Sequence, residues 1–302
     1  MRKERKKALI VAEVKGLRKN FGKKEVLTNI NLKFESGRIY GLFGKNGAGK
    51  TTLIRIFLGI LSPTEGEAYI FGKKPEGNLL EVGYLPENLS GYVNMNAFDN
   101  IDVIAKMMGI SLNKTEIMNI LDRVNLKEAA YKKIKDFSLG MRRRLQLAFA
   151  MLIGEKELMF LDEPTNGLDI EGSQWLKEEL KRAKTEGKTI VLSSHSLNEM
   201  EEVVDEFIII HNGEIKRQGT IQQLVFADEK MVKVKEADKE RMERLLKSYQ
   251  FTYRLSEERS FAIKEKEETK LLEIMVNEGI YPEKIEESKI SLENIFNEVT
   301  KE

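Results

Sequence analysis

The sequence predicts an α/β fold with a largely parallel sheet, followed by a smaller α+β unit, and three observations support this. Short apolar segments alternate with turn signals and with segments of helical spacing over the first two thirds of the chain. A glycine-rich break at 44–51 separates a strand-like segment from a helix-like one. After about Gln223 the chain becomes a series of short, charged elements, and a length of 302 residues fits two such units.

In chain order, the first apolar segments read as strands at 9–17, 26–34, 38–43 and 67–72. From about 94 to 136 apolar residues recur three and four positions apart, which predicts helices. Strands return at 157–164, 188–195 and 206–215, with a helical segment at 173–187. This rhythm of strand, helix and strand predicts a mixed, largely parallel sheet with a helical insertion.

The remaining segments read strand, helix, strand, strand, helix, strand, which is the order of a ferredoxin-like fold. An amphipathic segment at 291–302 follows them. We therefore predict a main domain at 8–220, with a helical subdomain at about 90–155, and a small α+β accessory domain at 224–302.

The composition excludes several classes of protein. A net charge of +1 gives no bulk signal for nucleic-acid binding. No apolar run approaches the roughly 18 residues of a membrane span, so we expect any membrane role to come through a partner. Cysteine is absent, which excludes a disulfide framework and thiolate chemistry and fits a cytosolic protein.

The break at 44–51 has the spacing G-x-x-x-x-G-K-T of a phosphate-binding loop. Glycines allow successive backbone N–H groups to turn around an anion at a helix N-terminus. Lys50 would reach the β- and γ-phosphates, and the Thr51 hydroxyl would ligate Mg²⁺. A plain glycine-rich turn is the alternative. The spacing indicates a P-loop NTPase whose nucleotide contacts are Gly44, Lys45, Asn46, Gly47, Ala48, Gly49, Lys50, Thr51 and Thr52.

Further polar groups stand at the ends of two later strands. Asp162 and Glu163 follow an apolar strand, where an aspartate completes the Mg²⁺ shell after a P-loop and the next carboxylate can act as general base. His195 ends another strand, where it could touch a γ-phosphate. Solvated acids and a packing histidine are the alternatives for these residues taken singly.

A helix over about 139–152 is predicted to begin with Ser138 as its N-cap. Its first turn offers the Ser138 hydroxyl, free N–H groups near Gly140 and a positive dipole end, all suited to an anion. Taken alone, it could be any capped helix.

Together these motifs resemble the ATP-binding cassette (ABC) ATPases over roughly residues 8–220. The resemblance implies that Phe21 stacks on adenine, that 44–51 and 158–163 are the Walker A and B motifs, and that Glu163 is the catalytic base. It also implies that His195 is the switch histidine and that Asp169 faces a partner subunit. Residues 137–141, "FSLGM", match the signature L-S-G-G-Q with departures at the first, third and last positions. Ser138 and Gly140 are retained, and in this family they meet the γ-phosphate held by the second copy of a homodimer.

A further departure is Glu87, which stands where the family mostly has glutamine. A carboxylate keeps metal ligation but cannot donate a hydrogen bond, so the resemblance implies a metal set of Thr51, Glu87 and Asp162. With "SLGM" and the late "SLENIF", Glu87 makes the chain most similar to cassettes paired with separately encoded ABC-2-type permeases, including exporters of bacitracin and lantibiotics.

The resemblance implies an ATP-hydrolysing subunit that uses ATP and Mg²⁺, dimerises across ATP and powers transport, with export favoured, through a separate integral membrane permease. It would lie in the cytoplasm at the inner face of the membrane, and no nucleic-acid partner is expected. One alternative is a soluble mechanical ABC ATPase that works without a permease. Another is a P-loop kinase, which leaves Ser138, Asp169 and His195 unexplained.

Overall fold

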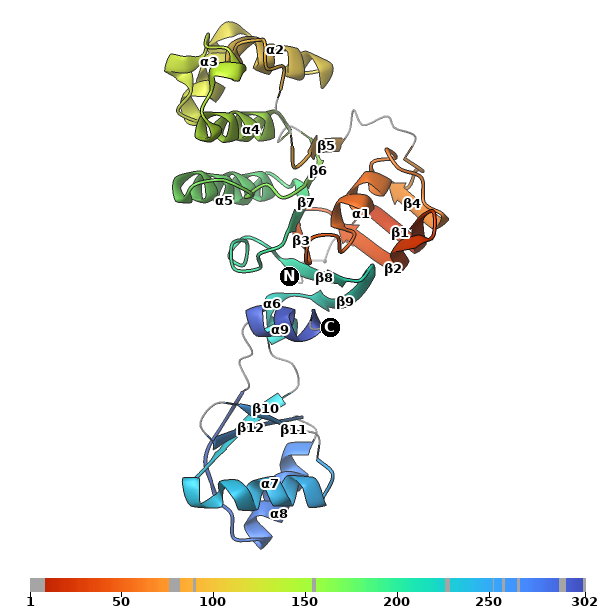
Figure 1. Cartoon of the computed structure of the whole chain (residues 1–302), viewed down its shortest axis with the longest axis vertical. Coiled ribbons are helices and arrows are strands. Elements are labelled where there is room, and N and C mark those ends of the chain that lie inside the picture. The colour runs from red at the N-terminus through yellow and green to blue at the C-terminus, as the bar shows by residue number, and fades with distance from the viewer. Residues whose placement is uncertain are drawn as a thin grey trace, which may run out of the picture. The chain divides into compact units, whose positions relative to one another are not determined.

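The computed structural model describes residues 9–75, 82–88, 91–153, 156–225, 229–251, 253–256, 259–264, 267–287 and 292–300 (Figure 1). The chain divides into two compact units, one of residues 1–218 with 299–302 and the other of residues 219–298. Each unit has its own sheet system and its own apolar core.

The first unit contains a three-stranded antiparallel sheet in the order β2-β1-β4. Its strands are β1 (Ile10–Phe21), β2 (Lys24–Glu35) and β4 (Glu65–Ile70). β1 and β2 form a hairpin because Gly22, with a φ of 59°, allows the chain to reverse within two residues. The sequence predicted these strands but not that they form a sheet separate from the parallel one.

A six-stranded sheet in the order β5-β6-β7-β3-β8-β9 forms the centre of the same unit. All pairs from β5 to β8 are parallel, and β9 follows β8 through a tight turn at Asn212 and Gly213, both with positive φ. Every residue of β3, β6 and β7 is buried, as expected for strands covered on both faces. The strands are β3 (Ile39–Phe43), β5 (Val82–Leu85), β6 (Leu158–Leu161), β7 (Thr189–Ser194), β8 (Glu206–His211) and β9 (Glu214–Gly219).

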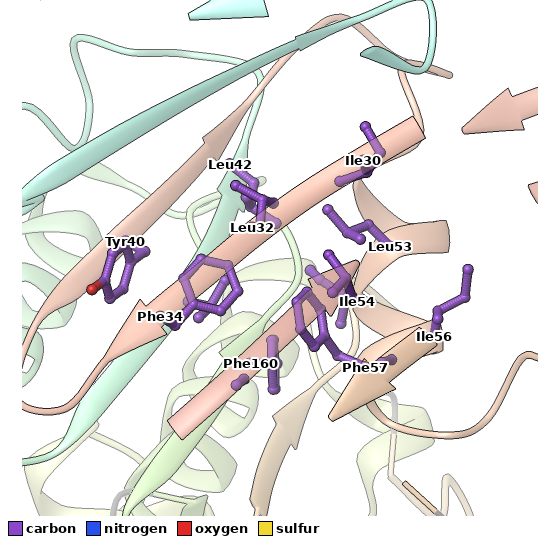
Figure 2. Close-up of a cluster of buried hydrophobic side chains, with 14 of the residues drawn as sticks. Ile30, Leu32, Phe34, Tyr40, Leu42, Leu53, Ile54, Ile56, Phe57 and Phe160 are labelled. Atoms are coloured by element: carbon purple, nitrogen blue, oxygen red, sulfur yellow. The ribbon is translucent and has the colours of Figure 1, made fainter. Parts of the chain in front are cut away.

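The helix α1 (Lys50–Phe57) is anchored in the core between the two sheets, as Figure 2 shows. The Phe57 ring lies 5.3 Å from Phe34 of β2 and 5.5 Å from Phe160 of β6, measured between centroids. Leu53 and Ile54 are also fully buried in this core. Close packing of this kind fixes the start of α1, and with it the loop that precedes it.

The predicted helical insertion is present as α2 (Ala97–Met107), α3 (Lys114–Arg123) and α4 (Leu139–Ile153), which lie together in Figure 1. Asn96 caps α2 by accepting a hydrogen bond from the Asp99 amide, and Asn113 and Glu116 form a capping box on α3. Two 3₁₀ turns, η1 (Lys127–Ala129) and η2 (Ile134–Asp136), lead to α4. After β6, the helix α5 (Ile170–Thr185) connects to β7.

The second unit contains a four-stranded sheet in the order β11-β12-β10-β13, in which all three pairs are antiparallel. Apolar residues of α7 and α8, including Met242, Leu246 and Leu271, form one core with Val232 and Phe261 of the sheet. The strand and helix order expected from the sequence is present. The elements are α6 (Ile221–Val225), β10 (Glu229–Val234), η3 (Glu236–Asp238), α7 (Lys239–Ser248), β11 (Tyr253–Ser256), β12 (Ser260–Lys264), α8 (Glu268–Asn277), β13 (Pro282–Glu287) and α9 (Leu292–Val299).

The end of the described chain departs from the predicted boundary at 224–302, because residues 299–302 group with the first unit. Thr300 is almost fully buried, and its carbonyl oxygen accepts a hydrogen bond from Lys45 Nζ at 2.9 Å. The short helix α6 was also not predicted. None of the helices in the described part of the chain is long and apolar enough to cross a membrane.

Candidate functional site

A cavity of about 460 Å³ opens at the carboxyl edge of the parallel sheet, where β3, β6 and β7 end. Open parallel sheets bind ligands at this edge, because the loops that follow neighbouring strands converge there. Most of the predicted site residues lie in its wall. The lining is Phe21, Lys24, Val26, Asn46, Gly47, Ala48, Gly49, Lys50, Thr51, Thr52, Glu87, Glu163, Asn166 and His195.

The glycine-rich loop between β3 and α1 has the backbone geometry that its sequence predicts. Gly49 has a φ of 108°, and a Cβ added there would lie 2.6 Å from a methyl group of Leu27. A Cβ added to Gly44 would lie 2.4 Å from the carbonyl oxygen of Ile210. A side chain at either position therefore requires the loop or its neighbours to move, which explains why both residues are glycine.

Lys50, the first residue of α1, lines the cavity and has a buried side chain. Its Nζ donates a hydrogen bond to the Gly44 carbonyl oxygen at 2.6 Å and lies 3.1 Å from Glu163 Oε1. Both partners of this ion pair are less than a tenth exposed, so solvent screens their attraction only weakly. The loop thus presents a buried cation to the cavity.

Glu163 connects the lysine to the end of β7. Its other oxygen, Oε2, lies 2.9 Å from His195 Nδ1, and His195 itself is half-exposed. Glu163 has a φ of 48°, in the left-handed region that non-glycine residues seldom adopt. Strained residues of this kind occur preferentially at functional sites, where the surrounding structure holds them in place. The structure therefore brings Lys50, Glu163 and His195 together.

Asp162 is not among the residues that line the cavity and is only 2% exposed. Its Oδ1 accepts a hydrogen bond of 2.6 Å from Ser193 Oγ, and the same hydroxyl accepts one of 2.9 Å from the backbone amide of Glu163. Ser193 was not among the predicted site residues, because its role depends on the pairing of β6 with β7.

Glu87 and Phe21 approach the cavity from two other directions. Glu87 follows β5 and accepts a hydrogen bond of 3.3 Å from Asn166 Nδ2. Phe21 is the last residue of β1 and is 50% exposed. Lys19 Nζ lies 5.0 Å from the centroid of its ring. Asn166 was also missed, although its place between Glu163 and Asp169 in "EPTNGLD" was an available signal.

The predicted metal ligands offer only oxygen donors, which suit Mg²⁺. Thr51 and Glu87 line the cavity, whereas Asp162 is buried and is not part of the lining. Within the described ranges, no three acidic or histidine side chains form a group that could hold a metal ion. The oxygen donors themselves fit Mg²⁺, which uses one or two carboxylates with waters and substrate phosphates.

Ser138, Gly140 and Asp169 do not line the cavity. Ser138 caps α4 as predicted, since its Oγ accepts a hydrogen bond of 3.2 Å from the Met141 amide. Asp169 caps α5 by accepting one of 2.7 Å from the Gly172 amide. Arg144 of α4 connects the two helix starts through Glu171 at 3.2 Å.

These two helix starts carry unusually exposed apolar side chains. Leu139 follows Ser138 and is 71% exposed, and Ile170 follows Asp169 and is 91% exposed. We call the surface formed by Ser138, Leu139, Gly140, Asp169 and Ile170 the helix-start surface. Polar capping groups and exposed apolar residues side by side are typical of a surface that binds another molecule.

Comparisons with known proteins agree on one family. A family model described as ABC transporter matches residues 27–166. The lantibiotic transport ATP-binding protein SrtF of Streptococcus pyogenes is 39% identical over 204 residues, covering 67% of this chain and 88% of the relative. The bacitracin transport ATP-binding protein BcrA of Bacillus licheniformis is 34% identical over 289 residues, covering 93% of this chain and 94% of the relative, so that similarity extends into the second unit.

Solved structures give the same result for the fold. The structure of an ATP-binding subunit of an ABC transporter superposes with a TM-score of 0.65 at 30% identity, covering 71% of this chain and 91% of that one. The dimeric structure of a post-hydrolysis state of the ATP-binding cassette MJ0796 bound to ADP and Pi superposes with a TM-score of 0.62 at 23% identity, covering 69% and 98%. The fold is therefore that of a P-loop ABC ATPase.

Proposed function

Because this chain belongs to the ABC transporter family as an ATP-binding subunit, we propose that it powers export through a separately encoded membrane permease. It is an ATPase, as its family implies. The cavity in which the glycine-rich loop, Lys50, Glu163 and His195 meet supports the ATP-hydrolysing part of this proposal. Relatives named for bacitracin and lantibiotic transport favour export as the direction.

In the proposed binding mode the triphosphate lies along the loop 44–49, whose backbone N–H groups and helix dipole attract its negative charge. Lys50 binds the β- and γ-phosphates, and the exposed Phe21 ring stacks on adenine. Mg²⁺, held by Thr51 and Asp162 with Glu87 nearby, would neutralise phosphate charge.

The Lys50 contacts indicate what ATP must displace on binding. The Glu163 carboxylate is the anion that pairs with Lys50, at 3.1 Å. An incoming phosphate competes with that carboxylate for the same cation. We propose that this exchange frees Glu163 to accept a proton from the attacking water, while His195 keeps it in position through the 2.9 Å contact.

The helix-start surface is the proposed contact with a second copy of the chain. Ser138 and Gly140 offer a hydroxyl and free N–H groups to a phosphate, yet they lie outside the chain's own cavity. A homodimer in which each copy caps the other's nucleotide uses these groups and covers Leu139 and Ile170.

We propose further that the second unit is a ferredoxin-like accessory domain. Its strand order and its three antiparallel pairs support this, together with the two helices that connect the strands. The whole protein would act at the inner face of the cell membrane, held there by the permease.

The function is tested by affinity capture of the tagged chain from detergent-solubilised native membranes, followed by mass spectrometry with quantification of each bound protein. We expect one integral membrane protein in stoichiometric amount, retained through washes at high salt. Recovery of ribosomal proteins or other water-soluble partners without a membrane protein would contradict the transporter assignment and favour a mechanical ATPase.

A further inference from the structure

Ser193 is the point at which the two adjacent carboxylates after β6 are connected to β7. Leu161 pairs with Leu192 in the parallel register, so the next residues, Asp162 and Ser193, lie side by side. The Ser193 side chain is fully buried. Its hydroxyl donates to Asp162 Oδ1 at 2.6 Å and accepts from the Glu163 amide at 2.9 Å.

A single hydroxyl group makes both of these contacts at once. A carboxylate oxygen requires a donor, whereas a backbone amide requires an acceptor. The serine hydroxyl has one proton to donate and lone pairs to accept with, so it satisfies both neighbours from a single atom. Alanine would remove both contacts and leave a buried carboxylate oxygen and a buried amide without their partner.

The two contacts restrain different parts of the site. The bond to the Glu163 amide holds the backbone at a φ of 48°, and this backbone directs the carboxylate toward Lys50 and His195. The bond to Asp162 fixes the rotation of that carboxylate by engaging one of its two oxygens. Residues that orient a metal-binding carboxylate in this way contribute to metal affinity without touching the metal.

We propose that Ser193 is a positioning residue that sets the Asp162 carboxylate for Mg²⁺ and the Glu163 carboxylate for the attacking water. This inference rests on the proposed roles of Asp162 and Glu163. It predicts that losing the hydroxyl lowers the turnover number and weakens metal binding at the site, so that more Mg²⁺ is needed for half-maximal rate, whereas nucleotide binding to the loop and Lys50 is retained.

Ser194 provides a matched control on the same strand. It is also fully buried, and its hydroxyl accepts from the Ser196 amide at 3.0 Å and donates to the Ser196 carbonyl at 3.1 Å. These contacts stay within the loop after β7 and involve neither carboxylate. Ser193→Ala and Ser194→Ala therefore delete the same atom from neighbouring buried positions.

The test compares the wild-type chain with Ser193→Ala, Ser193→Thr and Ser194→Ala. For each chain it measures kcat and KM for ATP, the Mg²⁺ concentration that gives half-maximal rate, and Mn²⁺ binding by electron paramagnetic resonance with a non-hydrolysable ATP analogue. We expect Ser193→Ala to lower kcat and Mn²⁺ affinity by about 10- to 100-fold with KM little changed. Ser193→Thr, which keeps the hydroxyl, should restore most of both, and Ser194→Ala should stay close to wild type.

The inference is overturned if the wild type is active and Ser193→Ala loses no more kcat or Mn²⁺ affinity than Ser194→Ala. If Ser193→Ala does not fold, as judged by thermal unfolding, Ser193→Cys replaces it under the same criteria, because a thiol is a weak donor. Failure of the proposed Mg²⁺ role is recognised separately, since the wild-type chain would then bind no Mn²⁺ with the analogue.

Discussion

Replacing Glu163 by glutamine is expected to lower steady-state ATP turnover by about 10²- to 10⁴-fold, the usual contribution of a general base. ATP binding should persist, because the loop and Lys50 remain intact. It should even tighten, since the neutral amide competes less with phosphate for Lys50, which lies 3.1 Å from the native carboxylate. Phosphate release and the affinity for a fluorescent nucleotide analogue measure the two effects.

Glu202→Gln is a suitable control for this variant. Glu202 is an exposed glutamate that pairs with Lys177 at 3.6 Å, away from the cavity lining. It should retain wild-type turnover and affinity. Rapid steady-state hydrolysis by Glu163→Gln would show that Glu163 is not the base.

Replacing Lys50 by methionine is expected to weaken nucleotide binding by about 10- to 100-fold, the loss expected for one or two charge-assisted hydrogen bonds. Methionine keeps much of the apolar stem of the lysine. It removes the Nζ group, which pairs with Glu163 and donates to the Gly44 carbonyl oxygen. Equilibrium binding of a nucleotide analogue measures the affinity.

Lys50→Met also leaves the buried Glu163 carboxylate without its lysine partner, so thermal unfolding must be followed in parallel. Lys216→Met provides the control, because Lys216 is on the edge strand β9 and pairs with Glu214 outside the cavity. If Lys50→Met stays folded and binds nucleotide as tightly as the control, the loop does not hold phosphate as proposed.

The sequence could predict the parts of the site that depend only on residues close together along the chain. The glycines of the loop at 44–51 indicate backbone angles that other residues avoid, and Gly49 indeed has a φ of 108°. The placing of Glu163 and His195 at strand ends could also be predicted, and the ends of neighbouring parallel strands share one edge of the sheet. The Ser138 cap followed from the preference of helix starts for a side-chain acceptor.

Contacts between strands and loops distant in sequence could not be predicted in the same way. Ser193 bridges Asp162 and Glu163 only because β6 and β7 pair in one register, which a single sequence does not specify. The bond from Asn166 to Glu87 joins two loops that are 79 residues apart. The separate antiparallel sheet was missed for a related reason: alternating polarity predicts a strand but does not indicate with which other strand it pairs.

We propose that a second copy of the chain completes the site through the helix-start surface. Sedimentation velocity of Glu163→Gln with ATP and Mg²⁺ tests this most directly. The two controls are the same variant with ADP, and the double variant Glu163→Gln with Ser138→Arg in the presence of ATP and Mg²⁺. We predict a two-copy species for Glu163→Gln with ATP, and single copies with ADP or when arginine occupies position 138. A single-copy species for Glu163→Gln at saturating ATP, or a dimer that is indifferent to Ser138→Arg, would contradict the account.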